Sequence, residues 1–302
     1  MDIDKVNTEV VLEEPKNIPT AATSMTLVQL SHHVPTFRKK DKRRTAQVNA
    51  QAGAQRKAAS VSKKYLDCAE LSAVETVKSD HYDFHIASTI PWLDGGIRGL
   101  SNRYLQEYMK ESSEWENLFN QKVDDFGEVY TWEASKEEAR MGALYDQSLY
   151  PDWEVVKRGF GVEVKYIPLA QASHFSEEIQ QEAMDYLKEE YTKGTQQLLE
   201  AGTADIIQRV LKPVLNLVKM IDYDDHDKPS GFRDTLIPNV EEVLLIMRRA
   251  NITNDATIES ARVELERILG RVSCDALRES GTLRAATKQE VQAVIESLPT
   301  LN

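Results

Sequence analysis

The stretch from Gly231 to Gly270 has the clearest helical periodicity in the chain, and it constrains the fold class most strongly. Its first apolar residues recur at spacings of three and four, on one face of a helix: Val240, Val243, Leu244 and Met247. Thr235 fits the N-cap of this helix, and Asn251 fits its end.

A second helix is expected directly after Asn251. Asn254 or Asp255 can cap it, and Gly270 ends it. Its inward-facing residues are expected to be Ile258, Ala261, Leu265, Ile268 and Leu269. The stretch therefore predicts an antiparallel helical hairpin.

Most of the remaining chain also has helical spacing, including residues 66–77, 102–123 and 136–148. Two further helices are expected near the middle of the chain, one capped by Ser176 and carrying residues to Tyr191, and another opened by Thr203 and running to Ile221. Alternation typical of strands is limited to three places, near residues 26–35, 82–100 and 160–168. We predict a mainly α protein, a multi-helix domain of amphipathic hairpins with a small β element of about two to four short strands.

Three regions are expected along the chain. Residues 1–24 are acidic and interrupted by prolines, so they predict a disordered tail. Residues 25–170 predict an α+β region that includes a basic arm at 38–64. Residues 171–302 predict an all-helical region that packs with residues 25–170 as one domain.

Composition favours a soluble cytoplasmic protein. No apolar run reaches the roughly 18 residues that a membrane span needs, and the acidic N-terminus lacks a signal-peptide core. Cys68 and Cys274 lie far apart without a CxxC pattern, which favours free thiols in a reducing compartment.

Charge is unevenly distributed along the chain. Residues 38–64 carry ten Lys or Arg against one acidic residue, Asp41, whereas the rest of the chain has 27 basic and 48 acidic residues. The remainder therefore has a net charge of −21, compared with −12 for the whole chain.

The basic arm is the first candidate site. It could bind nucleic-acid phosphates, lie in solvent as a helix from about residue 43 to 64, or dock on the acidic body of the same or a neighbouring subunit. It lacks aromatic residues between Phe37 and Tyr65 for stacking bases. The candidate contact residues are Arg38, Lys39, Lys40, Lys42, Arg43, Arg44, Arg56 and Lys57.

A metal site is a second hypothesis. His81, Asp83 and His85 would point to one face of a strand, where two imidazoles and a carboxylate could bind a metal ion. The acidic loop at 222–227 could supply further ligands, although polar residues that face solvent on a half-buried strand are the simpler explanation of the pattern.

No known catalytic or nucleotide-binding motif occurs: there is no G-x-S-x-G, no Walker A sequence and no G-x-G-x-x-G after a strand. We therefore predict no catalytic residue and no cofactor. An active site assembled from distant carboxylates stays open, because sequence spacing does not exclude one.

Four segments resemble the DUF3150 family of phage and prophage proteins, a domain of unknown function. They are LVQLSHHVPTF, IPWLDGGIRGLS, YPDWEVVKRGFGVEVKYIPL and FRDTLIPNVEEVLLIMRRANITNDATI, and the resemblance spans most of residues 26–280. The arm at 38–64 is richer in Lys and Arg than the family pattern. Such proteins tend to be encoded by tailed phages near a MoxR-type AAA+ ATPase and a von Willebrand-type (VWA) protein.

The resemblance implies a non-enzymatic adaptor in an infected or lysogenic bacterial host, which self-associates or engages that ATPase and VWA protein. The alternatives are a nucleic-acid-binding phage protein that uses the basic arm, and a metal-dependent hydrolase at His81, Asp83 and His85. Arg233, beside the acidic loop, is a further candidate for partner contact.

Overall fold

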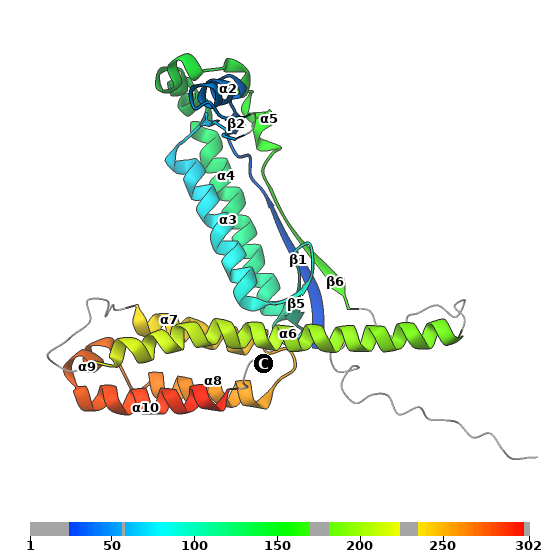
Figure 1. Cartoon of the computed structure of the whole chain (residues 1–302), viewed down its shortest axis with the longest axis vertical. Coiled ribbons are helices and arrows are strands. Elements are labelled where there is room, and N and C mark those ends of the chain that lie inside the picture. Colours follow the sequence, from blue (N-terminus) through cyan, green and yellow to red (C-terminus); the bar gives the residue numbers. More distant parts are fainter. Residues whose placement is uncertain (1–23, 56–57, 170–180, 224–234, 299–302) are drawn as a thin grey trace, which may run out of the picture. The chain divides into compact units, whose positions relative to one another are not determined.

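The protein is mainly α-helical with a small antiparallel β component, which confirms the predicted fold class. The computed structural model describes residues 24–55, 58–169, 181–223 and 235–298 (Figure 1). The chain forms two compact units, and each unit combines separate stretches of sequence. Unit 1 contains Met1–Gln29, Ile86–Gln106 and Tyr166–Asn302, and unit 2 contains Leu30–His85 and Glu107–Lys165.

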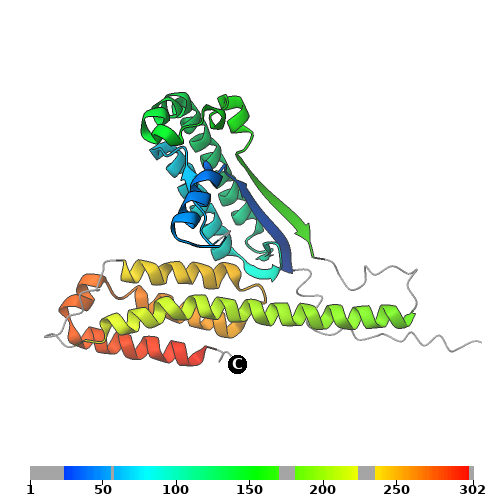
Figure 2. The ribbon, with the colours of Figure 1, turned by 45° about the horizontal axis from the view of Figure 1, so that its top comes forward.

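Unit 1 is a helical bundle with part of a sheet. Helix α6 packs against α7 and α10, and α8 packs against the same two helices (Figure 2). Its helices are α6 (Gln181–Ile221), α7 (Leu236–Ala250), α8 (Ala256–Leu269), α9 (Cys274–Glu279) and α10 (Gly281–Ser297). Its strands are β4 (Ile90–Leu93), β5 (Ile97–Ser101) and the first half of β1 (Met25–His33).

The hairpin of α7 and α8 forms as the sequence predicts. Asp255 caps α8 by accepting hydrogen bonds from the backbone N–H groups of Thr257 (2.8 Å) and Ile258 (3.1 Å). Thr235 occupies the N-cap of α7, but its side chain makes no capping bond. All five residues expected to face inward on α8 are buried.

The sheet has the strand order β4-β5-β1-β6, where β6 is Gly161–Pro168. Strand β1 runs antiparallel to β5, from Met25 opposite Ser101 to Gln29 opposite Ile97. Gly95 and Gly96, with φ of +77° and +79°, form the tight turn between β4 and β5, because glycine adopts positive φ without strain.

Unit 2 contains a pair of long helices. Helices α3 and α4 run antiparallel, because His81 bonds Ser112 while His85 bonds Tyr108. The core of unit 2 includes the fully buried Phe119 and Phe126. Its elements are β2 (Arg38–Lys40), α2 (Lys42–Gln51), β3 (Ser62–Lys64), α3 (Ala69–Ser88), α4 (Leu105–Met141), the 3-10 turns Gly142–Leu144 and Gln147–Leu149, α5 (Trp153–Lys157) and most of β6.

Three sequence predictions about elements are wrong. Residues 82–88 belong to α3 and are not extended; strands occur only later, at β4 and β5. The helices expected at 102–123 and 136–148 are not separate, because α4 continues to Met141. The two helices expected between residues 176 and 221 are also not separate, because in the described part of that range α6 is one continuous helix.

The expected tail at 1–24 lies almost wholly outside the described residues, and packing of the regions as one domain stays a prediction. Neither Cys68 nor Cys274 takes part in a disulfide bond among the described residues. Among the described residues, no helix combines the length and apolar character needed to cross a lipid bilayer.

Candidate polyanion-binding surface

The basic arm folds into a small β-α-β element, which we call the basic module (residues 38–55 and 58–64). Strands β2 and β3 pair antiparallel, and Asp41 N–H donates to the carbonyl of Val61 (2.9 Å). The long helix predicted for residues 43–64 is therefore only partly correct, because α2 ends at Gln51. Gly53, with φ of +59°, turns the chain away from the helix axis.

Two polar side chains of α2 hold the returning chain against the helix. Asn49, which is 7% exposed, donates to the carbonyls of Thr45 (2.9 Å) and Ala59 (3.2 Å) and accepts from Ala59 N–H (2.9 Å). Thr45 Oγ1 accepts from Val61 N–H at 3.0 Å. These bonds replace an apolar core in a segment that has few apolar residues, so they fix where the charges lie.

Phe37 joins the basic module to the rest of unit 2. Its φ of +46° is in the left-handed region, which a bulky side chain rarely adopts and which costs about 1–3 kcal/mol. Its ring is 3% exposed and lies in contact with Tyr65, Phe126 and Phe160. Burial of this ring offsets the strain and fixes the direction in which β2 begins.

Like charges face each other across the β2–β3 pair. Arg38 lies opposite Lys64, and Lys39 lies opposite Lys63. Directly opposed side chains in an antiparallel pair share a face and lie about 5 Å apart, so like charges there destabilise the sheet. The pairing therefore concentrates positive charge at a cost to stability.

Helix α2 adds a second unfavourable charge arrangement. Its first turn holds Lys42, Arg43 and Arg44 and no acidic residue. Cations at a helix N-terminus oppose the macrodipole, which favours anions there. Asp41 relieves part of this repulsion by accepting a hydrogen bond from Arg44 N–H at 2.8 Å.

The cations on β3 are tied to the rest of unit 2. Lys64 pairs with Asp67 (2.6 Å), and Lys63 donates to the carbonyl of Leu144 (2.7 Å). On β2, Lys39 approaches Asp146 at 3.5 Å. Five exposed cations of the basic module have no carboxylate within 4.0 Å in the described part of the chain: Arg38, Lys40, Lys42, Arg43 and Arg44.

A hollow of about 620 Å³ adjoins this surface in unit 2. Arg38 and Lys78 contribute cations to its lining, and Tyr82, which is 51% exposed, contributes an aromatic ring. An exposed aromatic ring, which the sequence between Phe37 and Tyr65 lacks, thus lies beside the cations of this hollow.

The predicted metal ligands do not converge. Because residues 81–85 are helical, His81 and His85 share the buried face of α3 while Asp83 is exposed. His81 is hydrogen-bonded to Ser112 (3.0 Å) and His32 (3.2 Å), and His85 is hydrogen-bonded to Tyr108 (2.7 Å). Within the described ranges, no group of three or more His, Cys, Asp or Glu side chains could hold a metal ion.

Burial lowers the pKa of both His81 and His32 to about 4. Lys78 and His33 contribute further to the lowered pKa of His32, and His32 contributes to that of His81. The two imidazoles are therefore neutral at pH 7, and the hydrogen bond between them joins β1 to α3.

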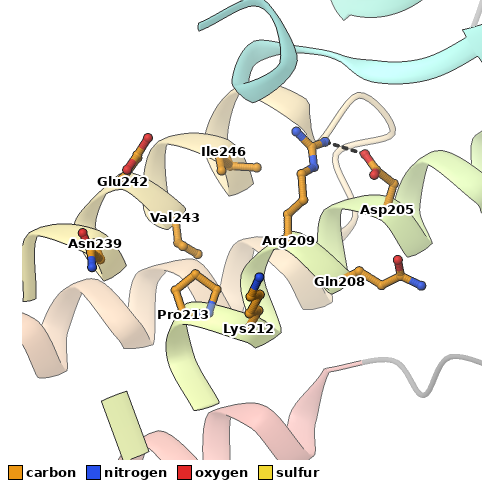
Figure 3. A pocket seen from close by; sticks show the side chains of 9 residues that line it. All are labelled: Asp205, Gln208, Arg209, Lys212, Pro213, Asn239, Glu242, Val243 and Ile246. Carbon is orange, nitrogen blue, oxygen red and sulfur yellow. Dashed lines mark ion pairs between the residues drawn. The ribbon is translucent and has the colours of Figure 1, made fainter. Parts of the chain in front are cut away.

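A hollow of about 400 Å³ between α6 and α7 also contains charged groups (Figure 3). Arg209 pairs with Asp205 at 2.7 Å, and it donates to the carbonyls of Ile86 (2.6 Å) and Thr89 (3.1 Å). Carbonyls at the end of a helix lack intrahelical partners. Arg209 thus holds the end of α3, and we assign it a structural role.

Other predicted contact residues lie outside the described part of the chain: Arg56, Lys57 and Arg233. Of the acidic loop, Asp222 is described, and it pairs with Lys288 at 2.7 Å. Lys63 and Lys64 lie in the predicted arm but were not among the candidate contact residues, and Tyr82 was not among them either. Lys63 and Lys64 were not identified because no local signal specifies which strand lies opposite Arg38. Tyr82 was not identified because it was expected on a strand.

No family model matches this chain, and neither a curated protein nor a solved structure shows significant similarity to it. The resemblance to DUF3150 therefore stays a prediction.

Proposed function

We propose that this chain is a non-enzymatic interaction protein whose basic module binds the phosphate backbone of nucleic acid. The observation that carries this proposal is the opposition of like charges across β2 and β3, Arg38 to Lys64 and Lys39 to Lys63. An arrangement that weakens the isolated sheet becomes favourable when phosphates lie between or over the cations.

The adjoining hollow favours single-stranded nucleic acid over duplex. A base could stack on the exposed ring of Tyr82 while Arg38 and Lys78 contact the flanking phosphates. Bases within a duplex are already stacked and cannot reach such a ring. The proposed ligand is thus a single strand, held mainly by its backbone and with little sequence preference.

The test is fluorescence anisotropy with a labelled single strand and a duplex of equal length, over a series of salt concentrations. Arg43→Glu/Arg44→Glu is expected to weaken binding at least about tenfold at low salt and to reduce the salt dependence. Lys193→Glu/Lys219→Glu on α6 changes net charge equally and is the matched control. No binding at low salt, or equal loss in both double variants, would contradict the proposal.

Tyr82→Ser separates backbone contact from stacking. It is expected to weaken single-strand binding by about 1–3 kcal/mol and to leave duplex binding unchanged. If Tyr82→Ser affects both ligands equally, or neither of them, the proposed preference for single strands is wrong. Binding through the charges of the basic module is decided separately, by the Arg43→Glu/Arg44→Glu variant.

A second candidate function is the adaptor role that the resemblance implies, with a MoxR-type AAA+ ATPase and a VWA protein as partners. The first part of α6, residues 182–197, contributes nothing to the hydrophobic cluster of unit 1, and its Tyr186 is 63% exposed. Met184, Leu187 and Tyr191 follow at the spacing of a helix-pairing stripe.

Mixing the protein with a purified MoxR-type AAA+ ATPase tests this role. We expect co-elution and a changed ATPase rate, and we expect Tyr186→Glu to weaken both effects. No complex and no rate change would count against an adaptor.

A further inference from the structure

A hollow of about 350 Å³ in unit 1, at the connection between α7 and α8, is lined almost entirely by polar side chains. Arg103 and Tyr104 follow β5, Arg248 is in the last turn of α7, and Asn251 and Asn254 belong to the connection. Three residues on α8 complete the lining: Glu259, Arg262 and Glu266. We call this site the arginine hollow.

The three charged residues of α8 in this hollow pair with one another and leave a net charge of −1, because two carboxylates share one guanidinium. Arg262 Nη2 pairs with Glu259 Oε1 (2.7 Å), and Arg262 Nη1 pairs with Glu266 Oε2 (2.8 Å). The side chain of Arg262 is only 16% exposed, so the guanidinium is fixed by two carboxylates in the fork geometry that arginine favours. These three residues form a fixed wall of net charge −1, so an anion in this hollow depends on the two remaining arginines.

The other two arginines lack such partners. Arg103 Nη1 donates to Asn254 Oδ1 at 2.6 Å, and the guanidinium carbon of Arg248 lies 5.7 Å from the centroid of the Tyr104 ring. No carboxylate of the described ranges lies within 4.0 Å of either guanidinium. Both cations nevertheless help to lower the pKa of Glu259, after the larger effect of Arg262, so their fields reach into the hollow.

The connection between the helices is held in a specific geometry. Asn251, which is 7% exposed, accepts from the N–H of Asp255 (2.8 Å) and donates to its carbonyl (3.1 Å). Asn254 has a φ of +53°, in the left-handed region that asparagine tolerates better than most residues. This conformation places the side chain of Asn254 within hydrogen-bond distance of Arg103.

We propose that the arginine hollow binds a small oxyanion, a carboxylate or a phosphate group, between the guanidinium groups of Arg103 and Arg248. Arginine binds both kinds of oxyanion through paired N–H donors, and the volume is at the lower end of small-molecule sites. The ring of Tyr104 limits the hollow on one side. The site is independent of the basic module, so its test does not depend on nucleic-acid binding.

Isothermal titration calorimetry of the full chain with inorganic phosphate and, separately, with succinate tests the proposal and distinguishes the two oxyanions. Saturable binding of at least one anion is expected. Arg248→Gln should weaken that binding about tenfold, and Arg103→Gln should act in the same direction. Arg271→Gln, an exposed arginine outside the hollow, removes the same charge and should leave binding unchanged.

Arg248→Lys keeps the positive charge but loses the paired N–H donors of the guanidinium. We therefore expect its affinity for the anion to lie between those of the native protein and Arg248→Gln, with the fold unchanged. Circular dichroism of each variant checks that the fold persists. No saturable binding of either anion, or an equal loss in Arg271→Gln, would overturn the proposal. Full binding in the Arg103→Gln/Arg248→Gln double variant would do the same.

Discussion

At the scale of single residues, the burial of His32 and His81 makes the stability of the fold depend on pH. Both pKa values lie at about 4, below the ordinary histidine value of 6.5, chiefly because burial disfavours the charged imidazole. Above about pH 6.5 both imidazoles are neutral in the folded and unfolded chain, so they leave the free energy of unfolding unchanged.

We therefore predict that the free energy of unfolding falls as pH drops from 6.5 toward 4. In this window the unfolded chain takes up protons that the folded chain excludes, and the loss is at most about 1.4 kcal/mol per pH unit for each imidazole. Because the two groups are coupled, the pair titrates as a unit. Urea unfolding at several pH values measures the effect.

His81→Gln keeps a hydrogen-bonding group but cannot titrate, so its stability should depend less on pH over this window. The exposed His33→Gln is the control and should change the pH profile much less, because His33 makes only the smallest of the three contributions to the lowered pKa of His32. Identical pH profiles for His81→Gln and the native chain would contradict the prediction.

The same residues show what sequence could reveal about the candidate sites. His81 and His85 were recognised as unusual, but the alternation of polar and apolar residues suggested a strand. Val74, Val77, His81 and His85 also recur at spacings of three and four, and all four are buried. The helical pattern is hidden because histidine counts as polar, although hydrogen bonds to Ser112 and Tyr108 allow its burial.

At the scale of elements, two glycines of α6 have opposite roles. A Cβ at Gly202 would lie 2.4 Å from Cδ1 and 3.3 Å from Cβ of Ile90 on β4, so α6 approaches the sheet closely only because a side chain is absent. A Cβ at Gly194 would meet no atom within 4 Å.

We predict that Gly202→Ala destabilises the protein by about 1–3 kcal/mol, because the added methyl group displaces Ile90. Gly194→Ala should stabilise it by about 0.5–1 kcal/mol, because alanine loses less backbone entropy in a helix. Denaturant midpoints of the two variants, compared at equal slope, measure both effects. If Gly202→Ala were stabilising, Ile90 could move aside at little cost, and the prediction would be wrong.

Gly202 also explains an error in the predicted elements. A cap-like Thr203 after Gly202 suggested that a new helix begins there, yet Thr203 Oγ1 donates to the carbonyl of Leu199 (3.0 Å) within continuous α6. Glycine, which disfavours helices, is tolerated at residue 202 because the absence of a side chain lets α6 contact Ile90 on β4. The local sequence does not encode this contact. The α7–α8 hairpin was predictable because its pattern and its Asp255 cap are both local.

At the scale of the whole molecule, charge is divided between a basic segment and an acidic remainder. Residues 38–64 carry ten of the 37 basic residues and only one of the 49 acidic ones. The cations on β2 and α2 that have no carboxylate nearby are therefore available to acidic surfaces of a second copy as well as to nucleic acid.

We predict salt-sensitive self-association. Analytical ultracentrifugation should show a higher mass at about 0.05 M salt than at about 0.5 M, because screening shortens the range of surface charges. Arg43→Glu/Arg44→Glu should remain at the lower mass, while Lys193→Glu/Lys219→Glu serves as the control. One mass at all salt concentrations would mean that the basic module does not dock on another copy.

The interleaving of the two units has a consequence for synthesis on the ribosome. The segments of unit 2 are complete once residue 165 has emerged, whereas unit 1 needs residues from both ends of the chain. At about 5–20 residues per second, the last 137 residues take roughly 7–27 seconds to appear. During that interval Met25, Ile90 and Trp92 lack the helices that bury them in the folded protein, so the nascent chain exposes apolar side chains to which chaperones can bind.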